Sequence, residues 1–128
     1  MSEILAVVDD LFFLAKIQQT AKLTGIQVEP VAPQNLMERL RRSPADAVLI
    51  DLNHRSGSAL AVLSTLKNDA SGRQVPVLAF LSHVQTDLAQ AARAAGCDLL
   101  LARSSFSQRL PELLCQLAGK APPPTADR

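Results

Sequence analysis

The stretch ILAVVDD, residues 4–10, decides the fold of this chain, because a continuous apolar run ends there at two adjacent acids. Consecutive apolar residues that include β-branched side chains are typical of a short strand buried on both faces of a sheet. The stretch AVLIDLN, residues 47–53, has the same form, with an apolar run that ends at Asp51. Two such strands in one small chain predict a parallel sheet covered by helices on both sides.

Strand-like and helix-like patterns alternate along the rest of the sequence. We expect three more strands at residues 26–31, 75–81 and 99–102, the first at a sheet edge because Pro30 cannot donate a backbone hydrogen bond. Apolar residues at three- and four-residue spacing predict helices at residues 11–24, 59–67, 86–95 and 107–117, and another that begins near Pro33. Gly25 and Gly96 are expected to end two helices, and Thr86 to cap one. This order predicts right-handed β-α-β crossovers and an α/β fold: a doubly wound, five-stranded parallel sheet in a three-layer sandwich.

The composition is that of a folded globular domain. The chain has 128 residues, 48% hydrophobic and 20% charged, which excludes an intrinsically disordered protein. We expect one domain at residues 1–119 and a flexible, proline-rich tail at residues 120–128. A net charge of +1 and an aromatic content of 3% argue against a nucleic-acid-binding protein. Because no apolar stretch reaches the roughly 18 residues of a membrane span, we expect a cytoplasmic protein without membrane contacts.

Acidic residues follow two of the expected strands directly. Asp9 and Asp10 end the first strand and Asp51 ends the third, so the three carboxylates should converge at one edge of a parallel sheet if these two strands are neighbours. Three unpaired anions would repel one another, and a hard cation such as Mg²⁺, which prefers oxygen ligands, would neutralise them. The alternative is that single acids cap helices or face solvent. The sequence therefore predicts a magnesium site, with N-capping as the competing role of each acid.

Four stretches follow one another along the chain: ILAVVDD, AVLIDLN, VPVLAF (residues 75–80) and AGCDLLLAR (residues 95–103). Together they resemble the receiver domains of bacterial two-component response regulators, over residues 3–117. The resemblance implies a flavodoxin-like fold in which Asp51 accepts a phosphoryl group. It implies Mg²⁺ held by Asp9, Asp10, Asp51 and the backbone carbonyl of Asn53. It also implies a histidine kinase or phosphotransfer protein as one partner, and a downstream protein target as another.

Three positions depart from the pattern of receivers. Leu81 stands where the fourth strand of a receiver ends in Thr or Ser, and the hydroxyl of Ser82 is a candidate shifted substitute, although a one-residue slip reverses side-chain direction. Arg103 and Ser104 replace Lys-Pro after the fifth strand; arginine keeps the positive charge in a longer, planar group. Leu100 replaces the aromatic switch residue. Loss of the hydroxyl should weaken the phosphorylated state by roughly 1.5–3 kcal/mol.

Two functions remain open at this point. The first is a stand-alone receiver in a phosphorelay, acting through protein contacts. It would not be an enzyme beyond self-phosphorylation from a phosphodonor and autodephosphorylation. The second is a pseudo-receiver, a protein-interaction module that works without phosphorylation. A monomer or weak homodimer is expected. We further expect Arg39, Arg41 and Arg42 to form a solvated helix face, and one of Phe12 and Phe13 to pack inward.

Overall fold

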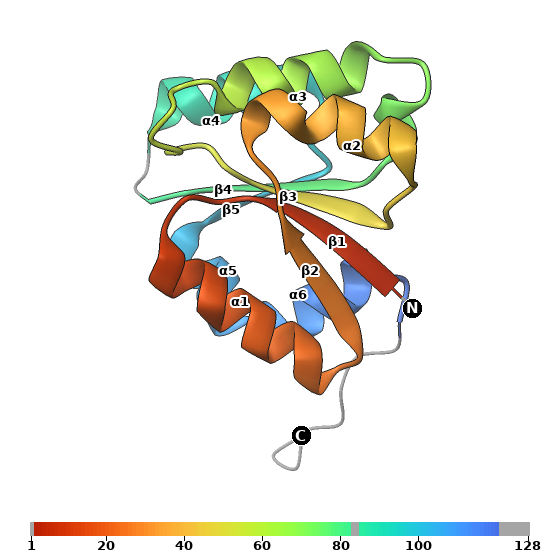
Figure 1. The fold of residues 1–128 in the computed structure, drawn as a ribbon. Helices are drawn as coiled ribbons and strands as arrows, with labels where there is room; N and C mark the ends of the chain where they lie inside the picture. Colours follow the sequence, from red (N-terminus) through yellow and green to blue (C-terminus); the bar gives the residue numbers. More distant parts are fainter. Residues whose placement is uncertain (1, 83–84, 121–128) are drawn as a thin grey trace.

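The computed structural model describes residues 2–82 and 85–120 and consists of one parallel sheet between two layers of helices (Figure 1). The strands are β1 (Ser2–Val7), β2 (Ile26–Pro30), β3 (Ala47–Asp51), β4 (Val77–Leu81) and β5 (Leu99–Ala102). The helices are α1 (Leu11–Leu23), α2 (Leu36–Arg42), α3 (Ala59–Asn68), α4 (Thr86–Ala95), α5 (Arg103–Gln108) and α6 (Leu110–Leu117), with short 3₁₀ turns at Pro33–Asn35 and Gly72–Gln74. The predicted doubly wound, five-stranded parallel sheet is confirmed. The predicted tail lies outside the described residues except for Lys120.

The order of the strands positions the acidic residues. The sheet runs β2-β1-β3-β4-β5, and every neighbouring pair is parallel. β1 and β3 are therefore direct neighbours, and Val7 is paired in register with Ile50. The carboxyl ends of the two strands meet at the same edge, so the acids that follow them lie close together. β2 forms one edge of the sheet, as Pro30 predicted.

Each face of the sheet buries its own apolar core. Alternate side chains of a strand point to opposite faces, so one strand supplies both cores. Ile4 and Ala6 of β1 pack beneath α1, α5 and α6, while Leu5 and Val7 pack beneath α2, α3 and α4 (Figure 1). This double burial explains why β1, β3 and β4 read as continuous apolar runs. Within the described residues, no helix is both long and apolar enough to cross a membrane.

The helix boundaries follow the predictions most closely where glycine ends the helix. Gly25 lies directly after the C-cap of α1 and Gly96 is the C-cap of α4, and both have positive φ, 75° and 100°. That backbone conformation costs glycine little and strains other residues. The predicted capping by Thr86 is wrong: Thr86 is the first residue of α4, and the cap, Gln85, makes no side-chain capping bond.

The C-terminal helical region begins earlier than predicted. A helix over residues 107–117 was expected, but α5 begins at Arg103, immediately after β5, and a separate α6 begins at Leu110. Pro111 lies in the first turn of α6 and has no backbone N–H that could continue the hydrogen bonds of α5. The helical conformation is therefore interrupted at Arg109. The earlier start buries Phe106 in the core below the sheet.

The prediction of a solvated arginine face on α2 is wrong for Arg39. Its side chain is only 7% exposed and forms ion pairs with Glu3, at 2.7 Å, and with Glu29, at 3.0 Å. Its Nη1 also donates to the backbone carbonyl of Ser43. Arg39 therefore joins β1, β2 and the end of α2 through one guanidinium group. Arg41 and Arg42 are exposed, as predicted.

Candidate functional site

An open pocket lies at the carboxyl edge of the sheet, beyond β1 and β3. Its volume is about 610 Å³, and its lining residues are Asp9, Asp10, Leu11, Phe12, Asp51, Asn53, Arg55 and Arg103. We call it the acidic pocket. The structure thus brings together five of the six predicted site residues, from segments up to 94 positions apart in the sequence. Ser82 is the exception, since it does not line the pocket.

Asp51 is the most buried acid of the pocket. It ends β3, is only 3% exposed, and its Oδ1 accepts a hydrogen bond from the backbone N–H of Asn53 at 2.8 Å. Burial raises the pKa of Asp51 above its usual value, against the opposing effects of the Asn53 N–H and the positive charge of Arg103. A buried carboxylate with one oxygen fixed by the backbone is a well-oriented group.

Asp10 is engaged through both of its carboxylate oxygens. Oδ1 accepts a hydrogen bond from the backbone N–H of Phe13 at 3.0 Å, which caps α1, and Oδ2 lies 2.5 Å from Nη2 of Arg103. The Phe13 N–H, and after it the Arg103 guanidinium, hold the pKa of Asp10 below its usual value. The N-capping role considered for these acids is therefore confirmed for Asp10, which also lies in the acidic pocket.

Asp9 is held more loosely. Its Oδ2 accepts a hydrogen bond from the backbone N–H of Arg55 at 3.1 Å and lies 3.7 Å from Nε of the same residue. Because the Arg55 side chain is 93% exposed, its ion pair with Asp9 is screened by water and contributes little. The backbone bond nevertheless ties the loop after β3 to the end of β1.

The acidic pocket has the right donor atoms for a divalent cation but not the right arrangement. Mg²⁺ takes oxygen ligands in octahedral geometry, and carboxylates supply such oxygens. Within residues 2–82 and 85–120, however, no three acidic, histidine or cysteine side chains lie together as a metal-binding group, and Arg103 holds the Oδ2 of Asp10. Mg²⁺ binding therefore stays a prediction.

The side chain of Asn53 joins two loops at the edge of the acidic pocket. Its Oδ1 accepts hydrogen bonds from the backbone N–H of Ser82, at 2.7 Å, and from the Ser82 hydroxyl, at 3.1 Å. Its Nδ2 donates to Oε1 of Gln85 at 2.8 Å. The Ser82 hydroxyl is thus committed to Asn53. Leu81, at the position of the usual hydroxyl residue, is buried in the core under α3 and α4.

Several of these contacts were not predicted from the sequence. The expected role of Asn53 involved its backbone carbonyl, whereas its side chain bridges to Ser82 and Gln85. The backbone N–H of Arg55 on Asp9 was also missed, as was the contact of Arg103 with Phe13. The bridge from Asn53 to Ser82 depends on β3 and β4 being neighbours, which places the loops after them side by side and which no local sequence pattern specifies.

Replacing Asp51 with asparagine is expected to stabilise the fold at neutral pH, where the buried carboxylate of the wild type is charged. The amide keeps the Oδ1 acceptor for the Asn53 N–H and removes the buried charge. Since the folded-state pKa of Asp51 is raised, the wild type loses stability as the pH rises from the ordinary pKa of a carboxyl group through the raised pKa of Asp51. Thermal unfolding of both proteins at pH 4 and pH 7 tests this, with a gap that should close at the lower pH. An Asp51→Asn variant less stable than wild type at pH 7 would contradict it.

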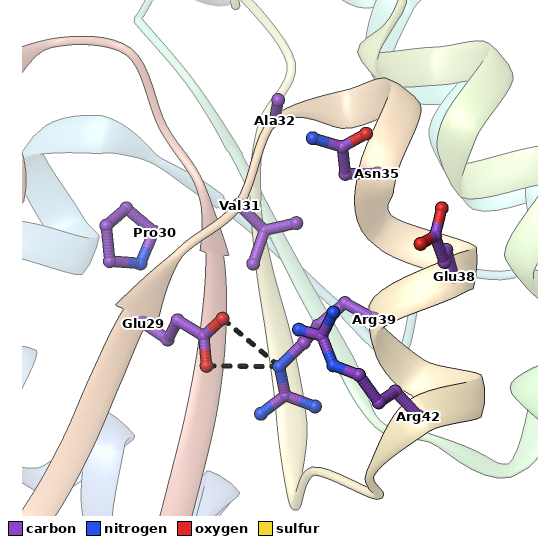
Figure 2. A pocket seen from close by; sticks show the side chains of 8 residues that line it. All are labelled: Glu29, Pro30, Val31, Ala32, Asn35, Glu38, Arg39 and Arg42. Carbon is purple, nitrogen blue, oxygen red and sulfur yellow. Dashed lines mark hydrogen bonds and ion pairs between the residues drawn. The ribbon is translucent and has the colours of Figure 1, made fainter.

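A second hollow, of about 290 Å³, lies between the end of β2 and α2 (Figure 2). Glu29, Glu38, Arg39 and Arg42 line it together with uncharged residues, so its formal charges balance. Figure 2 shows the Arg39 guanidinium facing the Glu29 carboxylate, with Arg42 beside it. The buried charge in this hollow, that of Arg39, is already paired with Glu3 and Glu29. The hollow is therefore lined by the ion network around Arg39.

The chain is similar to many solved receiver structures. The receiver domain of a sensor histidine kinase from Pseudomonas aeruginosa PAO1, solved with a magnesium ion in its active site cleft, is 22% identical at a TM-score of 0.79, covering 93% of this chain and 98% of that one. The phosphorylated cyanobacterial phytochrome response regulator RcpA is 20% identical at 0.79, covering 96% and 99%. The chemotaxis response regulator CheY4 of Vibrio cholerae is 18% identical at 0.78, covering 91% and 98%.

These likenesses establish the fold. No protein-family model matches the sequence, and a search of the curated proteins gave no match. The chain has the flavodoxin-like fold of response-regulator receiver domains over almost its whole length. The expected fold class is thereby confirmed.

Proposed function

We propose that this chain, which has the receiver fold, is a receiver-type signalling domain that accepts a phosphoryl group on Asp51. The observation that supports this most strongly is the position of the Asp51 carboxylate, in a pocket shared with Asp9, Asp10 and Arg103. The donor of the phosphoryl group would be a histidine kinase or a phosphotransfer protein. A downstream protein would then distinguish the phosphorylated chain from the unphosphorylated one through contacts with its surface.

The transfer would use groups that the chain itself provides. An oxygen of Asp51 forms a bond to phosphorus as the P–N bond of the donor's phosphohistidine breaks, and the released imidazole nitrogen takes up a proton from water. Asn53 N–H fixes Oδ1 of Asp51, which leaves Oδ2 for attack. Charge on the phosphoryl oxygens must be balanced by nearby cations, and a guanidinium such as that of Arg103 binds such oxygens in a bidentate manner. Beyond this step and hydrolysis of the acyl phosphate, we propose no enzymatic activity.

Incubation with phosphoramidate and Mg²⁺ should increase the intact mass of the protein by one phosphoryl group. Asp51→Ala should abolish the increase, because it removes the acceptor oxygen. Asp87→Ala, which changes an exposed acid in the first turn of α4, should leave the increase unchanged. Equal phosphorylation of the wild type and Asp51→Ala would show that another group is the acceptor.

The second candidate is a phosphorylation-independent interaction module. The commitment of the Ser82 hydroxyl to Asn53 and of Asp10 to Arg103 favours it, because the hydroxyl is then unavailable to a phosphoryl oxygen and the Asp10 carboxylate is unavailable to Mg²⁺. Absence of any mass increase in a protein whose circular dichroism shows it folded would support this module over the receiver function.

A further inference from the structure

Arg103 is held at the acidic pocket by two contacts at once. Its Nη2 lies 2.5 Å from Oδ2 of Asp10, and its guanidinium carbon lies 4.2 Å from the centroid of the Phe13 ring. An arginine over an aromatic face is attracted by the electron-rich ring, and the effect strengthens when the pair is partly removed from water. The Arg103 side chain is partly buried.

The position of Phe13 is itself set by the core. Its ring meets the rings of Phe80 and Phe106 edge-on, at centroid distances of 5.4 and 5.9 Å. Phe13 is buried, and it follows Asp10 by three residues at the start of α1. The guanidinium is therefore placed between a fixed carboxylate and a fixed ring, rather than lying on a mobile surface.

The charges of the pocket are largely balanced without an added ion. Three carboxylates, those of Asp9, Asp10 and Asp51, face two guanidinium groups, those of Arg55 and Arg103. Arg103 is the more effective of the two, because it is closer to its partner and less exposed than Arg55.

We propose that Arg103 is the resident cation of the acidic pocket and that it competes with divalent metal for Asp10. This inference rests on the proposed function only in treating the acidic pocket as the site of phosphoryl chemistry. A metal ion at Asp10 must displace the Arg103 guanidinium from both Asp10 and the Phe13 ring. The displaced guanidinium stays nearby and repels the metal ion, because both are positively charged. Arg103 thus determines the metal affinity of the site, and the wild type binds Mg²⁺ weakly.

Calorimetric titration of the unphosphorylated protein with MgCl₂ tests the competition. Arg103→Met keeps an apolar side chain over Phe13, and it should bind Mg²⁺ about tenfold more tightly than the wild type. Arg55→Met, in the same pocket but almost fully exposed, should change the affinity much less. The Mg²⁺-induced rise in melting temperature should follow the same order and provides a second readout.

Three outcomes would overturn the inference. These are equal Mg²⁺ affinity in wild type and Arg103→Met, an equal gain in Arg55→Met, and no Mg²⁺ binding by any of the three proteins. Should Arg103→Met fail to fold, Arg103→Gln, which also lacks the charge, takes its place in the same comparison. Failure of Asp51 to accept a phosphoryl group would leave this result intact, since the titration involves no phosphorylation.

Discussion

Replacing Arg39 with methionine is expected to lower the free energy of unfolding by about 2–4 kcal/mol and the melting temperature by about 10 °C. The guanidinium is buried and binds Glu3 and the carbonyl of Ser43. It also binds Glu29 (Figure 2). Methionine fills the same stem volume but leaves two carboxylates facing each other without a counter-charge. The loss should fall below that of a fully buried pair, because Glu3 and Glu29 are partly exposed and can turn to water.

Thermal and urea unfolding, followed by circular dichroism, measure this effect. The chain has no Trp and no Tyr, so tryptophan fluorescence is no substitute. Arg42→Met is the matched control: it changes an exposed arginine three residues later in α2 and should alter stability by less than about 0.5 kcal/mol. Similar losses in the two variants would mean that the ion network does not stabilise the fold.

The fold could be predicted because its signals are local. Runs such as residues 4–8 and 47–50 indicate strands buried on both faces, and the structure places β1 and β3 there to within two residues. Glycine at positions 25 and 96 marked helix ends because positive φ is required there. The strand order was not predicted, since no local pattern specifies which strands pair.

The parts that were missed depend on contacts between distant residues. Arg39 reads as one of three arginines on a polar helix, and only the positions of Glu3, 36 residues away, and Glu29 show that it is buried. The pair of Arg103 with Asp10 joins residues 93 positions apart. A single sequence lists these charges but does not pair them. Five of the eight residues that line the acidic pocket were therefore predicted, while their present partners were not.

The start of α5 was missed for a different reason. RSSFSQ, residues 103–108, carries three serines and one apolar residue, which reads as a loop rather than as an amphipathic helix. Its helical form brings Phe106 under the sheet, and that single burial outweighs the modest helix propensity of serine. Tertiary packing decided the structure where the local pattern was neutral.

Phe106→Ala should consequently cost about 3–5 kcal/mol, the most of any single core truncation that we propose. The ring is fully buried, stacks on Phe80 at a centroid distance of 4.9 Å and supports Phe13 edge-on. Alanine removes these contacts and leaves a cavity between α5 and the sheet. Phe106→Leu should cost only about 1–1.5 kcal/mol, because most of the volume remains.

Phe12→Ala is the control for this truncation, since Phe12 is 92% exposed and its loss should barely change stability. Urea unfolding of the three variants beside the wild type gives the comparison. A loss below about 1 kcal/mol in Phe106→Ala would mean that α5 is not packed as described.

The support that Phe106 gives to Phe13 extends to Arg103, so Phe106→Ala should also loosen the guanidinium from Asp10. In a variant that still folds, Mg²⁺ should then bind more tightly than in the wild type, which links the aromatic core to the charge of the acidic pocket.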